Sequence, residues 1–131
     1  MMNNTTIRNW EPVIGSFVHT LVKDGWKIRS VSDFEDRLVF TGDESINDIT
    51  RKVKEVCTGV DESSISFRKG DLGTSKSLGV SAYIILGNEP EEIVADWGYK
   101  NDESDAEFTK SWKKFTAKWE GKKCPTKEVS H

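Results

Sequence analysis

The sequence predicts an α+β protein in which helices pack on one four-stranded, mostly antiparallel sheet. Four segments carry apolar residues at alternating positions, which is the period of a β-strand. Other segments repeat apolar residues at every third or fourth position, which is the period of an amphipathic helix. Along the chain these segments read α-β-β-α-β-β-α-α.

The first predicted helix follows Asn9, a residue type that caps helices well. Pro12 falls in the first turn, where no backbone N–H is needed. Gly25 is placed to end the helix, because glycine readily adopts the left-handed conformation found after many helices. The apolar face consists of Trp10, Val13, Ile14, Phe17 and Leu21.

A predicted hairpin comes next, with strands at residues 26–30 and 37–41 and a turn at residues 33–36. Its first strand alternates cleanly, so that Lys27 and Arg29 point away from the face that Trp and Ile side chains would bury. This pattern is typical of a strand that is covered on one face only.

A second helix and two further strands are predicted between residues 45 and 87. Ser45 with Asp48 forms a weak capping box, and Gly59 ends the helix. The apolar stripe of this helix consists of Ile46, Ile49, Val53, Val56 and Cys57. The strands lie at residues 64–68 and 78–87, and a polar loop separates them.

The run at residues 78–87 is the most apolar in the chain. Tyr83 and Ile85 make it apolar on both faces near its end, so we expect it to lie inside the sheet. Asn88 begins a second capping-box pattern, which predicts a short helix that continues through Trp97.

The strongest helix pattern spans residues 105–120, where aromatic residues recur at steps of four, three and four. Ser104 with Glu107 is a capping box for it, and Gly121 ends it. We expect the aromatic stripe to belong to the core: Phe108, Trp112, Phe115 and Trp119.

The composition of the 131 residues fits one domain, which we place at residues 9–121 between flexible segments at 1–8 and 122–131. The net charge of −3 gives no argument for nucleic acid. Cys57 and Cys124 belong to no ligand cluster, which favours free thiols. No apolar leader or membrane-spanning run is present, so we expect a cytoplasmic protein.

No motif in the chain predicts catalysis or metal binding. The loop at 70–77 lacks the Walker A spacing, because Ser75 stands where glycine should precede the lysine. His19 has no nucleophile or carboxylate at a recognisable spacing. The acidic run around residues 96–107 lacks the glycine and spacing of an EF-hand. We therefore expect a protein that is not an enzyme and has no cofactor or metal.

Two basic groups are candidate binding surfaces. The first flanks the loop, and the second lies on the last helix away from its aromatic stripe. The residues are Arg68, Lys69 and Lys76 in the first group and Lys110, Lys113, Lys114 and Lys118 in the second. The helix lysines are typical either of a solvated face or of a surface that binds phosphates.

The stretch YIILGNEPEEIVADW, followed by a lysine- and aromatic-rich helix ending in KWEG, resembles small phage- or prophage-encoded accessory proteins of unknown function. The resemblance covers roughly the C-terminal half. It implies no activity and no catalytic residue, but a role in modulating a host component by binding it. We therefore expect a non-enzymatic binding protein with an unidentified protein partner. The alternative is nucleic-acid binding through the basic helix and the 68–77 loop.

Overall fold

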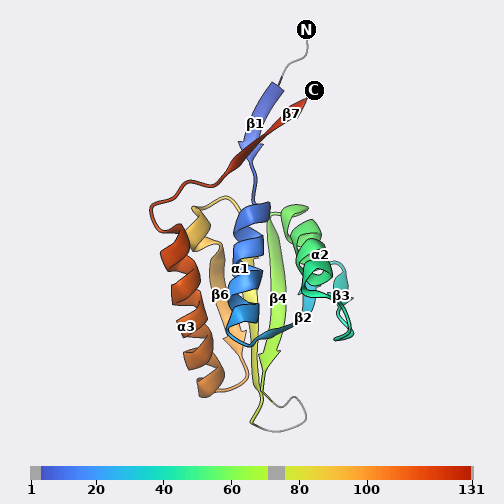
Figure 1. Ribbon diagram of the computed structural model, residues 1–131, viewed down its shortest axis with the longest axis vertical. Helices are drawn as coiled ribbons and strands as arrows, with labels where there is room; N and C mark the ends of the chain where they lie inside the picture. Colours follow the sequence, from blue (N-terminus) through green and yellow to red (C-terminus); the bar gives the residue numbers. More distant parts are fainter. Residues whose placement is uncertain (1–3, 71–75, 131) are drawn as a thin grey trace.

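The computed structural model describes residues 4–70 and 76–130 and confirms the α+β class. Within these residues, five antiparallel strands form one sheet in the order β3-β2-β4-β5-β6, and three α-helices cover one face of it (Figure 1). The helices are α1 (Glu11–Lys23), α2 (Ile46–Thr58) and α3 (Asp102–Trp119). The strands are β2 (Lys27–Ser32), β3 (Arg37–Val39), β4 (Glu62–Lys69), β5 (Leu78–Ile85) and β6 (Val94–Tyr99).

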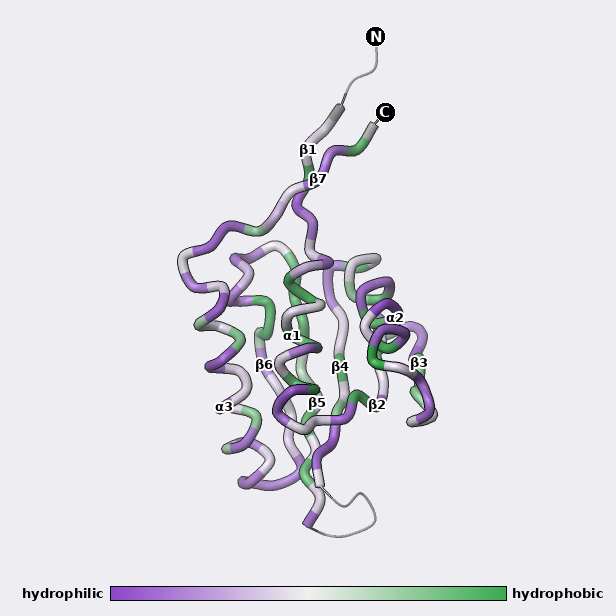
Figure 2. The backbone as a smooth tube through the Cα atoms, viewed as in Figure 1, coloured by the Kyte–Doolittle hydropathy of each residue, from purple (hydrophilic) through white to green (hydrophobic). Residues whose placement is uncertain are grey.

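The core lies between the helices and the covered face of the sheet. Phe17 of α1 is at its centre, with ring centroids 6.4 Å from Phe67, 6.2 Å from Phe108 and 5.3 Å from Phe115. All three pairs meet edge to face, a geometry that aromatic rings favour. In Figure 2, hydrophobic segments recur along α1 and the strands behind it.

The four predicted strands all lie in this sheet, and β5 lies inside it, between β4 and β6. The start of α2 is also as predicted, because the Ser45 hydroxyl accepts a hydrogen bond from the Asp48 N–H at 3.2 Å. Gly25 follows α1 with a φ of 94°, the left-handed conformation expected of it. Local sequence signals therefore predict most of the sheet and of the helices that cover it.

The start of α3 differs from the prediction by three residues. The cap is Asn101, whose side-chain oxygen accepts from the Ser104 N–H at 2.8 Å. Ser104 is fully buried instead, and its hydroxyl accepts from the Gly79 N–H at 3.0 Å. Ser104, which the sequence predicted as the helix cap, therefore connects α3 to β5.

The predicted helix through Trp97 is wrong, because residues 90–92 form only one 3₁₀ turn and Val94–Tyr99 is strand β6. Val94 pairs with Ile84 and Trp97 with Ala82, with a register shift between them. A bulge of this kind lets two residues three positions apart face the same side of a sheet. The apolar spacing therefore imitates a helix, while pairing with β5 decides the structure.

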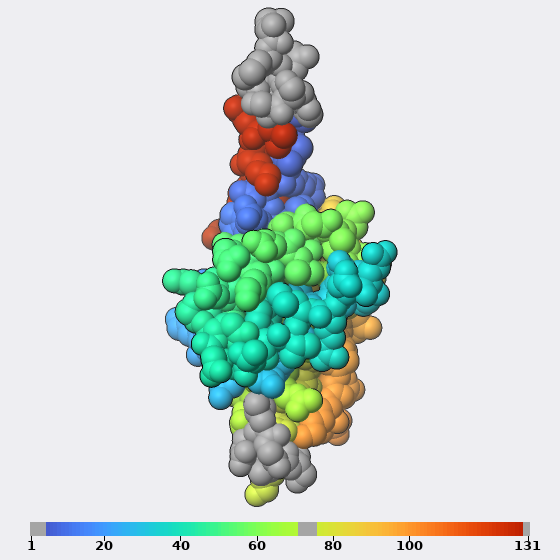
Figure 3. Space-filling view, turned by 90° about the vertical axis from the view of Figure 1, so that its right-hand side faces the viewer, coloured from blue at the N-terminus to red at the C-terminus, as the bar shows by residue number. Residues whose placement is uncertain are grey.

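A second, two-stranded sheet projects from the body (Figures 1 and 3). Its strands are β1 (Asn4–Arg8) and β7 (Thr126–Ser130), which pair antiparallel from Asn4 with Ser130 to Arg8 with Thr126. The Arg8 guanidinium fixes its base by donating to the carbonyl oxygens of Gly87 and Asn88. The sequence did not predict this ribbon, because each strand pairs only with the opposite end of the chain.

Candidate functional site

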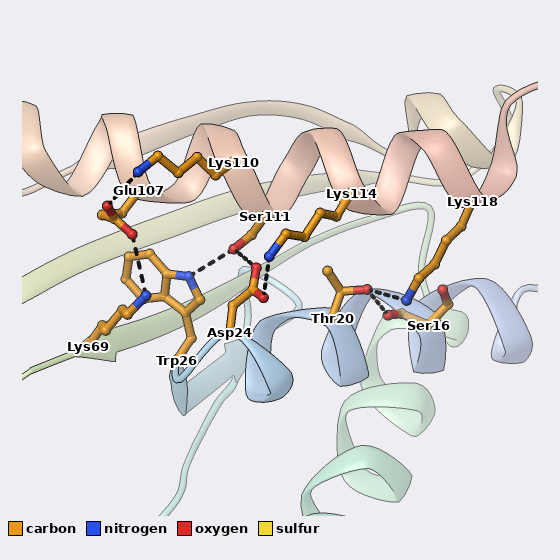
Figure 4. Close-up of polar contacts among 10 residues, drawn as sticks. All are labelled: Ser16, Thr20, Asp24, Trp26, Lys69, Glu107, Lys110, Ser111, Lys114 and Lys118. Carbon is orange, nitrogen blue, oxygen red and sulfur yellow. Dashed lines mark hydrogen bonds and ion pairs between the residues drawn. The ribbon is translucent and has the colours of Figure 1, made fainter.

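Two lysines of α3, Lys114 and Lys118, reach across to α1 (Figure 4). The Lys114 Nζ atom is 2.8 Å from Asp24 Oδ1, and the Lys118 Nζ atom donates to Thr20 Oγ1 at 3.1 Å. Both partners belong to α1 or its C-terminal end. These two lysines of the predicted basic surface therefore help to hold α3 to the body.

Glu107 pairs with two more of the predicted cations. Its carboxylate is 3.1 Å from the Lys110 Nζ atom and 3.4 Å from the Lys69 Nζ atom. Hydrogen bonds from both lysines lower the pKa of Glu107 below its ordinary value. Lys113 is exposed elsewhere on the helix, so α3 does not present its lysines as one unoccupied cationic surface.

A buried polar chain lies beside these ion pairs and includes a serine and an aspartate. Trp26 Nε1 donates to Ser111 Oγ at 3.2 Å, and Ser111 Oγ donates to Asp24 Oδ2 at 2.6 Å (Figure 4). Ser111 is only 2% exposed, and its hydroxyl faces a carboxylate and an indole N–H. This geometry anchors a helix and offers no access for a substrate.

The face of the sheet opposite the helices, which we call the open face, contains a hollow. Small residues form its floor: Ser66, Ser81, Gly79 and Gly98. Four long cationic side chains surround a hollow of about 480 Å³ above that floor: Arg29, Arg37, Arg68 and Lys100. Side chains alternate between the faces of a strand, so small and long residues on neighbouring strands combine into a basin. We call it the basic hollow.

A bulge in β2 contributes to the basic hollow. The pairing of β2 with β4 shifts register between Ile28 and Ser30, and Arg29 lies at the shift. Arg29 lines the hollow together with Ser66, which pairs with Ser30 across the strands. The bulge therefore directs the Arg29 side chain toward the open face.

The cations of the basic hollow are not neutralised by acids. None of the residues that line it is Asp or Glu. Within residues 4–70 and 76–130, the guanidinium groups of Arg29, Arg37 and Arg68 form no ion pair, and the Lys100 Nζ atom donates only to Ser77 Oγ and O, at 2.8 and 3.1 Å. The hollow therefore concentrates positive charge on a chain with a net charge of −3.

A second hollow of about 460 Å³ continues the first along β5 and β6. Ser81 and Gly98 line both hollows, and Tyr83 and Asp96 line the second one. The Phe34 ring lies against Tyr83, with centroids 5.6 Å apart. We call this part of the open face the aromatic hollow. The open face thus has a cationic half and an aromatic half.

Tyr83 also interacts with an acid. The hydrogen bond to the Glu62 carboxylate is the main cause that raises the pKa of the Tyr83 hydroxyl above its ordinary value. Glu62 and Asp96 belong to the strands on either side of β5. One carboxylate, Asp96, therefore lines the aromatic hollow and another, Glu62, lies beside it, whereas the basic hollow presents cationic donors.

Of the predicted site residues, only Arg68 lines the basic hollow. Lys76 is exposed in the turn that precedes β5, and residues 71–75 of the predicted loop lie outside the described part of the chain. Arg37 and Lys100 were not predicted as site residues, because no local pattern marks them. Arg29 was predicted on the outward side of its strand, and that pattern was a usable signal.

The other candidate groups show no site. In the described part of the chain, no group of three His, Cys, Asp or Glu side chains could hold a metal ion, and no helix could cross a membrane. Both cysteines are free and buried. Burial raises the pKa of Cys57 to about 11, so this thiol stays protonated and a weak nucleophile at neutral pH.

Comparison with known proteins adds no family: no family model matches the chain, and searches of curated proteins and of solved structures found no match.

Proposed function

We propose that this protein is a non-enzymatic binding protein that holds nucleic acid on the open face of its sheet. The observation that carries the proposal is the basic hollow, where four cations surround a floor of small residues and, among residues 4–70 and 76–130, no acid pairs with them. Arg37, Arg68 and Lys100 are exposed and Arg29 is half-buried, so a ligand can reach them. A cleft lined by charge of one sign attracts ligands of the opposite charge. A phosphate backbone supplies that charge at regular intervals.

The side chains of the basic hollow match phosphate chemistry. An arginine guanidinium presents a planar set of donors that fits two phosphate oxygens at once. The Ser66 hydroxyl donates to Ser81 Oγ at 3.2 Å, which leaves the Ser81 hydroxyl as a donor on the floor. Binding would release the counterions that neutralise phosphates, and this release drives non-specific affinity.

A protein partner was the first expectation from the sequence, and an acidic protein surface could also pair with these cations. The aromatic hollow favours nucleic acid instead. Tyr83 lines this hollow, which shares Ser81 and Gly98 with the basic hollow, and Phe34 packs on Tyr83, an arrangement similar to that of base-stacking residues in sheets that bind RNA. The protein partner stays a prediction and is an outcome of the experiment below. The cytoplasm, where both kinds of partner occur, remains the proposed location.

The test is the affinity for a fluorescent single-stranded oligonucleotide, measured by anisotropy at several salt concentrations. We expect the double change Arg29→Gln and Arg68→Gln to weaken binding strongly. It should also reduce the slope of log affinity against log salt by roughly 1.4, because each phosphate contact to a single strand contributes about 0.7.

The matched control is the double change Lys113→Gln and Lys122→Gln, which removes the same charge from exposed positions away from the open face. It should leave the affinity and the slope nearly unchanged. Equal losses in both double variants would contradict the proposal, because binding would then follow net charge alone. The proposal would also be contradicted if the protein bound an acidic protein but showed no measurable binding to the oligonucleotide near physiological salt.

A further inference from the structure

Phe34 has an unusual backbone conformation. Its φ is 73°, and it is the one non-glycine residue with positive φ among residues 4–70 and 76–130. A bulky side chain in this region is a steric outlier, because its Cβ crowds the following carbonyl oxygen. Strained residues of this kind persist where the surrounding structure enforces them, and they cluster at functional sites.

The turn around Phe34 is built to hold that conformation. The Ser32 hydroxyl accepts from the Phe34 N–H at 3.0 Å. Asp33 Oδ1 accepts from the N–H groups of Glu35 and Asp36 at 2.9 and 2.7 Å. These backbone hydrogen bonds lower the pKa of Asp33. The ionised carboxylate of Asp33 therefore holds the turn in place.

Burial does not explain the position of the Phe34 ring. The residue is 57% exposed, whereas the core phenylalanines are almost completely buried. Its one aromatic neighbour in the described structure is Tyr83, in the aromatic hollow. The strained turn thus places an exposed aromatic ring on the open face.

We infer that Phe34 and Tyr83 form a stacking platform for an unpaired base, so that the site selects single-stranded over double-stranded nucleic acid. The inference rests on the proposed function, because the basic hollow would hold the adjoining phosphates. The two hollows share Ser81 and Gly98, so one strand could place its backbone over the cations and a base on the rings. Asp96, in the aromatic hollow, could accept a hydrogen bond from an amino group of that base.

The preference for single strands follows from where the bases lie. In a duplex the bases are stacked and paired, so presenting one to a protein ring requires unstacking it at a cost. In a single strand the base faces are available, and stacking on an aromatic side chain adds to affinity with little dependence on sequence. The phosphates are available in both forms, so the cations alone would not discriminate between them.

The experiment compares Phe34→Gly with Phe34→Tyr, using a single strand and a duplex of the same length. Phe34→Gly removes the ring and relieves the left-handed strain, so its Tm should stay the same or rise. Its affinity for the single strand should fall about 5- to 150-fold, the range for losing one stacked base, while duplex affinity stays unchanged. Phe34→Tyr keeps a ring and should bind the single strand as the wild type does.

Three results would overturn the inference. A clear fall in Tm for Phe34→Gly with unchanged affinity would make Phe34 a structural residue. Equal losses of affinity for the single strand and the duplex would remove its role in selection, and so would unchanged affinity for both. None of these results alters the effect expected of Arg29→Gln and Arg68→Gln, so failure of the inference is distinguishable from failure of the proposed function.

Discussion

Replacing Phe108 with alanine is expected to lower the free energy of unfolding by about 3–5 kcal/mol, the usual cost of truncating a fully buried phenylalanine. Phe108 is 0% exposed and meets three other aromatic rings. Its ring centroid is 6.2 Å from Phe17, 5.2 Å from Phe67 and 4.9 Å from Trp97. The cavity would therefore open where α1, α3 and two strands meet. Urea unfolding followed by tryptophan fluorescence measures the loss.

The matched control for this change is Tyr99→Ala. Tyr99 is an aromatic residue of β6 that is 50% exposed, so its removal should cost less than about 1 kcal/mol. A loss in Phe108→Ala no larger than in this control would contradict the packing of α3 against the sheet.

Replacing Asp24 with alanine is expected to cost about 1–3 kcal/mol, because the buried Ser111 hydroxyl would lose its acceptor. The matched control is Lys114→Gln, which removes the ion pair and keeps that hydrogen bond. The Lys114 side chain is 61% exposed, so this change should cost less than about 1 kcal/mol. Equal costs in the two variants would show that the ion pair, and not the buried chain, fixes α3.

The effect of Asp24 should also depend on pH. Burial alone would raise its pKa, but hydrogen bonds from Lys114 and Ser111 outweigh burial, so the pKa lies below its ordinary value of 3.8. A carboxyl group whose pKa is depressed by folding stabilises the protein above the unfolded pKa, and this contribution disappears as the pH falls through the folded pKa. The difference in stability between wild type and Asp24→Ala should therefore shrink below about pH 4. A difference that stays constant into the acid range would contradict this account.

The helices and four of the five sheet strands could be predicted because their signals are local. Apolar spacing, capping residues and glycines act within a few residues of each other, as at Ser45 and Gly25. Strand β6 could not be predicted in this way, because a bulge gave Val94 and Trp97 the spacing of a helix. The β1–β7 ribbon joins residues at opposite ends of the chain, and no local pattern announces such a pairing.

The candidate site was less predictable than the fold, for a related reason. Arg29, Arg68 and Lys100 come from different strands or their ends, and only the order of the strands brings them together. The lysines of α3 were close in sequence and looked like a surface. Asp24, which pairs with Lys114, is remote from it in the sequence. Glu107, which pairs with Lys110, lies on the same helix. Clustering in sequence therefore did not reveal that several of these lysines have partners within the protein.

The central claim is that nucleic acid binds the open face, and backbone NMR tests it most directly. An unlabelled single-stranded oligonucleotide is added to ¹⁵N-labelled protein, and the shift of each amide is followed. We expect the largest shifts along the two hollows, at Ser66, Arg68, Ser81 and Gly98, with a further shift at Phe34. Amides of α3 around Lys113 should move little. Largest shifts on α3 or on the β1–β7 ribbon, or no shifts at all, would contradict the claim.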